Sequence, residues 1–386
     1  MKKTLLALGL ASVMAAPAMA ADVEIYGLID EGLTYLHTDS DTAGIDDTDQ
    51  LKMDHGLTYG SRWGIRGTED LGNGLKVGFT LESGIEPDTG KADSKQGGRL
   101  FGREASLNVS GNFGTVRMGR MPIFGSVLGA DGLFRALDPM NANYTDAMGS
   151  GLYSASMWTR VDNAISYRSP TFNGFTAYAM YSFQNDANQA GAVEGKSSSD
   201  RYGSLALRYK GGAFEGVFVA DTTNWANVKG NKDTEDDGYT FTLGGNYTFE
   251  NGLKVIGWAQ YWNNQNLQVR SGVSANALTE FMKKVNGLEI KRYGYGFVDG
   301  WGAGLGINYP VLGGTAKAAV YYRDMDNTKD VDFTRYGFGA GYDYPLSKRT
   351  VLYGLTGWTQ EKIEATGQDT VKPSGYQLSV GLVHRF

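Results

Sequence analysis

The sequence ends with Tyr376-Gln377-Leu378-Ser379-Val380-Gly381-Leu382-Val383-His384-Arg385-Phe386. Apolar residues occupy alternate positions from Tyr376 to Phe386, interrupted by His384, and most of the residues between them are polar or small. A period of two indicates a β-strand with one dry and one wet face. Because the chain ends on this strand, its edge needs a partner. We expect the partner to be the first strand of the mature chain, near Val23, which closes the sheet into a barrel.

Composition favours a β-sheet protein. The chain of 386 residues contains 55 Gly and 47 aromatic residues (23 Tyr, 17 Phe and 7 Trp), and it has no Cys with which to form a disulfide. After residue 20 there is no run of roughly 18 apolar residues, the length that a membrane-spanning helix needs. The formal net charge of −6 argues against a nucleic-acid partner. A large soluble β-sandwich or propeller is the alternative.

Residues 1–20 have the pattern of a secretion signal peptide. Two lysines precede an apolar core, and Ala18-Met19-Ala20 supplies small residues at the expected cleavage site. The segment is too short to span a bilayer. We therefore expect residues 21–386 to form the mature domain of an exported protein.

Sixteen alternating segments follow, joined by connections that are in turn long and short. The predicted strands are 23–35, 57–67, 75–82, 102–110, 115–121, 161–168, 174–183, 201–209, 213–221, 239–249, 253–262, 301–309, 315–323, 335–344, 350–358 and 376–386. Strands of about ten residues, tilted by about 45°, match the height of an outer-membrane apolar band. Alternating short turns and long loops are typical of a barrel with one rim in the periplasm. The sequence therefore predicts an all-β fold, a 16-stranded antiparallel transmembrane β-barrel.

The connection over residues 122–159, called the long loop below, is unlike the others. It has no clear period and carries many apolar residues, whereas a solvated loop of this length is normally polar. We expect it to fold inward, pack against the barrel wall and form a constriction. Its acidic residues include Asp131, Asp138 and Asp146, with Arg135 between them. The alternative is an exposed loop that buries its apolar residues in a neighbouring subunit.

The motifs taken together resemble those of the general diffusion porins of Gram-negative outer membranes, and most closely the beta-proteobacterial type. The matching motifs are residues 25–30 (IYGLID), 61–72 (SRWGIRGTEDLG), 111–116 (GNFGTV), 163–167 (NAISY), 346–350 (LSKRT) and 380–386 (VGLVHRF). The resemblance implies a passive channel for ions and small hydrophilic solutes in the cell outer membrane. It also implies a homotrimer, contacts with outer-membrane lipids and lipopolysaccharide, and insertion by the barrel assembly machinery through a C-terminal signature ending in Phe386.

In that family, three wall arginines face acidic residues on the third loop. The matching positions here are Arg62, Arg103 and Arg160, and their arrangement implies an anion preference. Strand alternation supports an inward direction for Arg62 and Arg160. It places Arg103 with the apolar residues Leu107 and Val109, so a bulge or a position outside the membrane band is needed to turn Arg103 inward.

Glu82 and Asp131 are the expected opposing charges, and Arg66 and Asp138 complete the candidate pore-lining set. Each arginine taken alone is also compatible with a snorkelling surface residue. Acidic residues in the expected outer loops, such as those at 46–49 and 233–237, oppose an anion preference.

Other chemistries find little support in the sequence. His37, His55 and His384 are far apart and no cysteine accompanies them, so we expect no zinc site. Residues 39–44 begin like a calcium loop but lack its later ligands. Residues 302–306 (GAGLG) are a strand face bare of side chains rather than a dinucleotide loop, since no helix follows. We expect no cofactor and no catalytic residues. The alternatives are a channel selective for small organic anions and, with less support, a barrel adhesin or enzyme.

Overall fold

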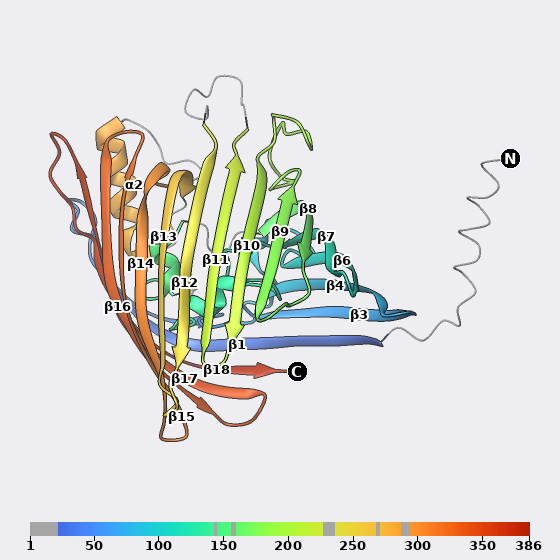
Figure 1. The fold of residues 1–386 in the computed structure, drawn as a ribbon. Helices are drawn as coiled ribbons and strands as arrows, with labels where there is room; N and C mark the ends of the chain where they lie inside the picture. Colours follow the sequence, from blue (N-terminus) through green and yellow to red (C-terminus); the bar gives the residue numbers. More distant parts are fainter. Residues whose placement is uncertain (1–21, 143–144, 156–159, 227–235, 268–270, 287–293) are drawn as a thin grey trace.

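The computed structural model describes residues 22–142, 145–155, 160–226, 236–267, 271–286 and 294–386. These residues form a closed, antiparallel β-barrel, which Figure 1 shows with the strands from the middle of the chain (green to yellow) running upward and the first strands (blue) lying nearly horizontal. The expected signal peptide, residues 1–20, lies outside the described residues.

Sixteen strands run around the barrel, and each pairs antiparallel with its neighbours. They are β1 (Asp22–Asp39), β3 (Arg62–Gly72), β4 (Leu75–Glu86), β6 (Glu104–Gly111), β7 (Gly114–Pro122), β8 (Arg160–Arg168), β9 (Phe175–Ser182), β10 (Arg201–Gly211), β11 (Phe214–Asn224), β12 (Gly238–Thr248), β13 (Lys254–Leu267), β14 (Gly296–Val311), β15 (Gly314–Asn327), β16 (Val331–Pro345), β17 (Thr350–Ala365) and β18 (Ser374–Arg385). The predicted fold class and strand count are confirmed.

The first and last strands close the barrel. Their register pairs Leu28 with Arg385 and continues to Asp39 opposite Ser374. Beyond the last strand, the backbone N–H of Phe386 donates to the carbonyl of Gly27 at 3.1 Å, and the reverse bond is 3.2 Å long. The pairing of the two ends, expected from the terminal strand, is confirmed, and it closes the sheet over residues 27–39 of β1.

Two further strands, β2 (Thr48–His55) and β5 (Lys91–Ala92), were not expected. The polar connection anticipated between residues 36 and 56 instead contains β2. Residues 31–38 of β1 pair with β2, and residues 22–28 of β1 pair with β3. Leu51 and Met53 of β2 point outward and are 75% and 58% exposed. The intervening Lys and Asp residues hide this short apolar alternation in the sequence.

Between β2 and β3 the chain leaves the wall and turns inward at residues 56–61. The buried carboxylate of Asp30 holds this segment, which we call the notch. It accepts hydrogen bonds from the backbone N–H of Thr58 (2.8 Å) and of Tyr59 (2.7 Å), from the Thr58 hydroxyl (2.8 Å) and from the Tyr353 hydroxyl (2.6 Å). Four donors compensate the cost of burying this carboxylate.

An α-helix, α2 (Gly272–Asn286), lies in the connection between β13 and β14 and was not predicted. Val273, Ala277, Leu278, Phe281 and Met282 form its buried face. Their spacing in the sequence is typical of a helix. The helix was missed because the alternating patterns of the strands before and after it dominate this part of the sequence. No helix in the described parts of the chain combines the length and the apolar character needed to cross a membrane.

The outer surface of the barrel wall is apolar, and its inner surface is polar. Outward residues such as Ile25, Leu205 and Val320 are 70%, 64% and 58% exposed. Inward positions carry polar groups, and the following are buried: Thr34, Thr240, Thr242, Gln260, Thr359, Gln377 and Ser379. Exposed aromatic residues gather near strand ends, among them Tyr239, Tyr247, Phe249, Trp301, Tyr309 and Tyr344. An apolar band with aromatic residues at its borders is typical of an outer-membrane barrel.

Candidate functional site

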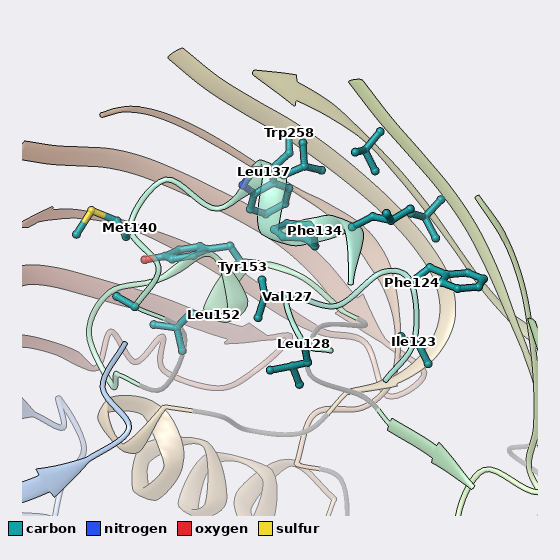
Figure 2. Packing of buried hydrophobic residues seen from close by; sticks show 14 of the residues in the cluster. Ile123, Phe124, Val127, Leu128, Phe134, Leu137, Met140, Leu152, Tyr153 and Trp258 are labelled. Carbon is teal, nitrogen blue, oxygen red and sulfur yellow. The ribbon is translucent and has the colours of Figure 1, made fainter. Parts of the chain in front are cut away.

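The long loop folds into the barrel, as expected. Described for residues 122–142 and 145–155, it includes the short 3-10 helices η3 (Leu133–Leu137) and η4 (Ser150–Tyr153). Figure 2 shows its apolar side chains packed against the wall. Phe134 meets Trp258 edge to face at 5.1 Å between ring centroids, and Tyr153 stacks on Tyr321 at 4.9 Å. Loop residues such as Leu137 and Met140 are fully buried.

Inward-facing glycines make room for the loop. A Cβ atom on Gly306 would lie 2.5 Å from Pro139, and one on Gly357 would lie 2.6 Å from the Cβ of Met148. At Gly302 the same space is taken by the carbonyl oxygen of Tyr153. The bare strand face at residues 302–306 is therefore part of the seat of the long loop, because only glycine permits so close an approach of another chain segment.

Hydrogen bonds fix the loop on this seat. The Tyr153 hydroxyl lies 2.9 Å from Thr359 Oγ1, and the Asn246 amide donates to the carbonyl of Ala136 at 2.8 Å. The backbone N–H of Ala155 donates to Gln260 Oε1 at 2.7 Å. Burial raises the pKa of Tyr153 to about 12, so its hydroxyl stays neutral. The long loop is thus held by packing and by polar bonds.

Arg62, Arg103 and Arg160, called the arginine cluster below, are brought together on the wall from β3, from the residue just before β6 and from β8. Arg103 Nε donates to Glu82 Oε1 at 2.7 Å, and Arg62 Nη1 lies 3.7 Å from the same oxygen. Arg160 Nε donates to the carbonyl of Arg103 at 2.9 Å. Tyr26 adds a hydroxyl bond of 3.0 Å to Glu82.

Arg103 points inward because it is not part of a strand. Strand β6 begins at Glu104, so the alternation that places Leu107 outside does not extend to residue 103. The backbone N–H of Arg103 still donates to the carbonyl of Glu82, and its side chain is only 1% exposed. Strict alternation grouped Arg103 with the outward residues Leu107 and Val109. Its inward direction is explained by its position just before the strand and not by a bulge.

The acidic residues take different positions from those expected. Glu82, on β4, lies on the same part of the wall as the arginine cluster and not across from it. Asp131 of the long loop pairs with Arg117 at 3.0 Å and with Arg168 at 2.8 Å, two arginines outside the predicted set. The loop therefore contacts the wall at β7 and β8 through charged groups as well as through its apolar side.

The two remaining candidates pair with residues other than those of the arginine cluster, although Arg66 lies over the ring of Tyr26, whose hydroxyl bonds to Glu82. Arg66 pairs with Glu24, lies 4.8 Å from the ring centre of Tyr26 and has a side chain that is 57% exposed. Asp138 accepts a hydrogen bond of 3.0 Å from the Ser150 hydroxyl, within the long loop. Asp138 thus helps to shape the loop from inside.

Sequence reasoning missed Arg135 and Arg120 as candidate site residues. Arg135 is anchored by bonds of 3.0 and 2.8 Å to the carbonyl of Val127, and it lines a cavity of about 20 Å³ together with Arg62 and the notch. Arg120 pairs with Asp162 at 2.5 Å. Alternation along 115–121 puts Arg117 inside, and the register shift between Gly119 and Met121 changes the pattern next to Arg120. Among the described residues, no group of three His, Asp or Glu is placed to hold a metal ion.

Comparison with known proteins agrees with this architecture. The family model of Gram-negative porins matches residues 4–363. An outer membrane porin of Bordetella pertussis is 32% identical, with all of both chains covered, and porin 32 of Delftia acidovorans is 32% identical over 95% of this chain and 92% of its own.

Solved structures show the same fold. A structure described as an anion-selective porin from Comamonas acidovorans superposes with a TM-score of 0.68, at 25% identity over 95% of this chain and 100% of that one. OmpF of Salmonella typhi, at 12% identity, covers 94% of this chain and 97% of its own with a TM-score of 0.58, which shows the fold alone. The family and the fold are those of a channel rather than of an enzyme. The apolar exterior, the polar interior and the inward loop agree with these comparisons. The chain belongs to the Gram-negative porin family and is a diffusion channel of the outer membrane.

Proposed function

We propose that this porin passes small anions in preference to cations and that the arginine cluster sets the preference. The observation that carries the proposal is the convergence of Arg62, Arg103 and Arg160 from three segments of the wall. The solved relative from Comamonas acidovorans, described as anion-selective, supports the same direction.

The mechanism is electrostatic and needs no energy source. A guanidinium group remains charged in any environment and is weakly hydrated, so it attracts anions without holding them tightly. A single guanidinium attracts a monovalent anion 5 Å away by about 3 kcal/mol at an effective dielectric constant of about 20, before salt screening. The long loop narrows the lumen and brings solutes to such distances, whereas Glu82 and Asp131 weaken the positive field. Solutes cross by diffusion and are sorted by size and charge.

Replacing Arg62 and Arg160 by Gln tests the proposal. The reversal potential of the purified protein in a planar bilayer, measured across a tenfold KCl gradient, should move toward the value for cations. Lys283→Gln is the control for loss of a positive charge elsewhere, because Lys283 forms an exposed pair with Glu280 on α2 and is not among the candidate pore-lining residues. An unchanged reversal potential in the double variant removes the cluster from the selectivity mechanism.

A channel selective for small organic anions is the second candidate. Arg62 of the wall and Arg135 of the long loop border the same small cavity, and two neighbouring guanidinium groups suit a passing solute that carries two negative charges. Such a channel should show conductance that saturates with an organic anion and blocks chloride current. A conductance proportional to concentration for every anion tested indicates general diffusion instead.

We also propose the partners and the processing that the family implies. Outward apolar residues at Ile25, Leu33, Leu51 and Met53 suit contact with lipids, lipopolysaccharide or a second subunit in a homotrimer. Native electrophoresis before and after heating tests the trimer. Cleavage after residue 20 predicts a mature protein whose N-terminal sequencing begins at Ala21.

A further inference from the structure

Three charged side chains form a row inside the barrel wall, well removed in strand order from the arginine cluster. The register places Arg323 of β15 opposite Arg335 of β16, and Arg335 opposite Glu361 of β17. Their side chains are only 3%, 2% and 0% exposed. We call these three residues the buried ion triad. Two like charges directly opposite each other in a sheet destabilise it unless something compensates them.

The triad is only partly neutralised within the described residues. Glu361 pairs with Arg323 and, at 2.7 Å, with Arg335. The Tyr295 hydroxyl donates its single hydrogen to this carboxylate and lies 2.9 and 2.8 Å from the two oxygens. Two guanidinium groups against one carboxylate leave a formal charge of +1 in a site from which water is largely excluded. An uncompensated buried charge is costly, by several kcal/mol in real proteins.

A small cavity lies beside these arginines. Its volume is about 10 Å³, close to that of one water-sized probe, and it is lined by Arg323, Arg335, Ser154, Tyr295 and nearby residues of the long loop and β13. Arg323 Nε, Arg335 Nε and Ser154 Oγ are buried, and no described residue forms a hydrogen bond with any of the three atoms. The two arginine nitrogens can only donate, and the serine hydroxyl can donate as well.

We propose that this cavity is a binding site for a monatomic anion of chloride size. An anion there would neutralise the surplus charge of the triad and accept hydrogen bonds from Arg323, Arg335 and Ser154. A chloride ion is larger than the water molecule that a cavity of about 10 Å³ accommodates, so its binding requires the side chains of Arg323 and Arg335 to move slightly apart. A water molecule leaves the charge in place and cannot accept three hydrogen bonds. The site lies behind the long loop, so it would hold a structural ion rather than an ion in transit.

The position of the site gives the bound anion a role. Arg323 Nη1 donates to the carbonyl of Leu152 in the long loop at 3.0 Å, and Arg335 bonds to the hydroxyl of Ser274 in α2. The triad thus holds the long loop and α2 on the same wall. An anion that stabilises the triad therefore stabilises the constriction, and loss of the anion should loosen it.

Exchange of chloride for gluconate at constant ionic strength tests the proposal. The full protein in a neutral detergent should unfold at higher temperature and at higher urea concentration as chloride increases, because a ligand that binds only the folded state stabilises it by mass action. Bromide should replace chloride, and gluconate should not, since it exceeds the cavity. Equal stability in all three anions overturns the proposal, because a bound water gives no halide dependence.

Variants at Ser154 locate the effect. Ser154→Val fills the cavity and removes one donor, so the halide dependence should disappear. Ser154→Ala should need about tenfold more chloride for the same stabilisation, the cost of one hydrogen bond to a charged group. Ser204→Val on β10 is the control for a buried serine elsewhere, and it should keep the halide dependence of the parent protein. Crystals soaked in bromide should show anomalous scattering between Arg323 Nε and Arg335 Nε. Absence of that peak, or full halide dependence in Ser154→Val, contradicts the site.

Discussion

The carbonyl oxygen of Tyr153 in the long loop occupies the space that a Cβ atom on Gly302 of β14 would need. A backbone carbonyl cannot move aside as the end of a flexible side chain can. The long loop can therefore take its position only if residue 302 has no side chain.

Gly302→Ala should displace the long loop and destabilise the barrel by about 1–3 kcal/mol, the usual cost of overpacking. We expect single-channel conductance in planar bilayers to change and current noise to increase. Gly354→Ala on β17 is the matched control, because a Cβ atom there has no atom within 4 Å. Identical current traces for the two variants contradict the role assigned to Gly302.

Glu82→Gln should increase anion preference and lower stability together. The substitution removes the carboxylate that Arg103 contacts at 2.7 Å and Arg62 at 3.7 Å, so the positive field grows while Arg103 loses a buried partner. We expect a loss of about 3 kcal/mol in the free energy of unfolding, since breaking a buried pair leaves its charge behind. Reversal potentials and urea unfolding measure the two effects separately. A shift of the reversal potential toward cations contradicts the expectation.

Glu361→Gln should be among the most destabilising single substitutions in the barrel wall. It leaves Arg323 and Arg335 facing each other without a counter-charge, and the expected cost is about 3–5 kcal/mol. Glu364→Gln on the same strand is the control, because Glu364 and its partner Lys362 are partly exposed and such a pair contributes at most about 1 kcal/mol. Urea unfolding midpoints of the two variants, compared with the parent protein, decide the matter. Similar midpoints show that the triad does little for stability.

Anion preference should weaken as salt increases. The Debye length falls from about 10 Å at 0.1 M to about 3 Å at 1 M, so the arginine cluster acts over a shorter part of the lumen in concentrated salt. Permeability ratios derived from reversal potentials should therefore be larger around 0.1 M than around 1 M. A ratio that is constant over this range points to size sorting rather than to charge.

Phe386→Ala should reduce the amount of barrel assembled in the membrane. Phe386 lies next to Gly27 where the two ends of the barrel meet, and its ring fills the space beside that glycine. The backbone bonds between Gly27 and residue 386 remain possible, so we expect a defect in assembly yield rather than in the conductance of the channels that form. Heat-modifiable mobility of the membrane fraction measures the yield, and a normal yield removes the residue from the proposed assembly signal.

The sequence was most informative where a period of two continues for many residues. The terminal strand, its pairing with the first strand and the short turns were all predictable, because one dry face and one wet face are a property of local sequence. The inward fold of the long loop was predictable from its apolar content. Residues 302–306 were recognised as a bare face, yet their role as the seat of the loop needed the position of Tyr153, which is far away in the sequence.

Other features depend on contacts between distant segments. The helical spacing of α2 was present in the sequence but short, and its amphipathic face is buried by strands that precede and follow it. The direction of Arg103 followed from where β6 begins, and strand boundaries are the least predictable part of such a pattern. The partners of Asp131 depend on how the long loop crosses the lumen, so sequence reasoning identified the charged residues but paired them differently.

The notch has a consequence for how such a channel can be altered. Arg62 follows directly after residues 56–61, where the backbone ladder beside β1 passes from β2 to β3 and is interrupted. The charge that we propose to filter solutes therefore lies where the hydrogen-bond ladder of the wall is interrupted, next to the segment that the carboxylate of Asp30 holds. A substitution at Arg62 or in residues 56–61 that is meant to change the ion selectivity therefore also changes the rigidity of the barrel wall. The two properties cannot be altered independently at these residues.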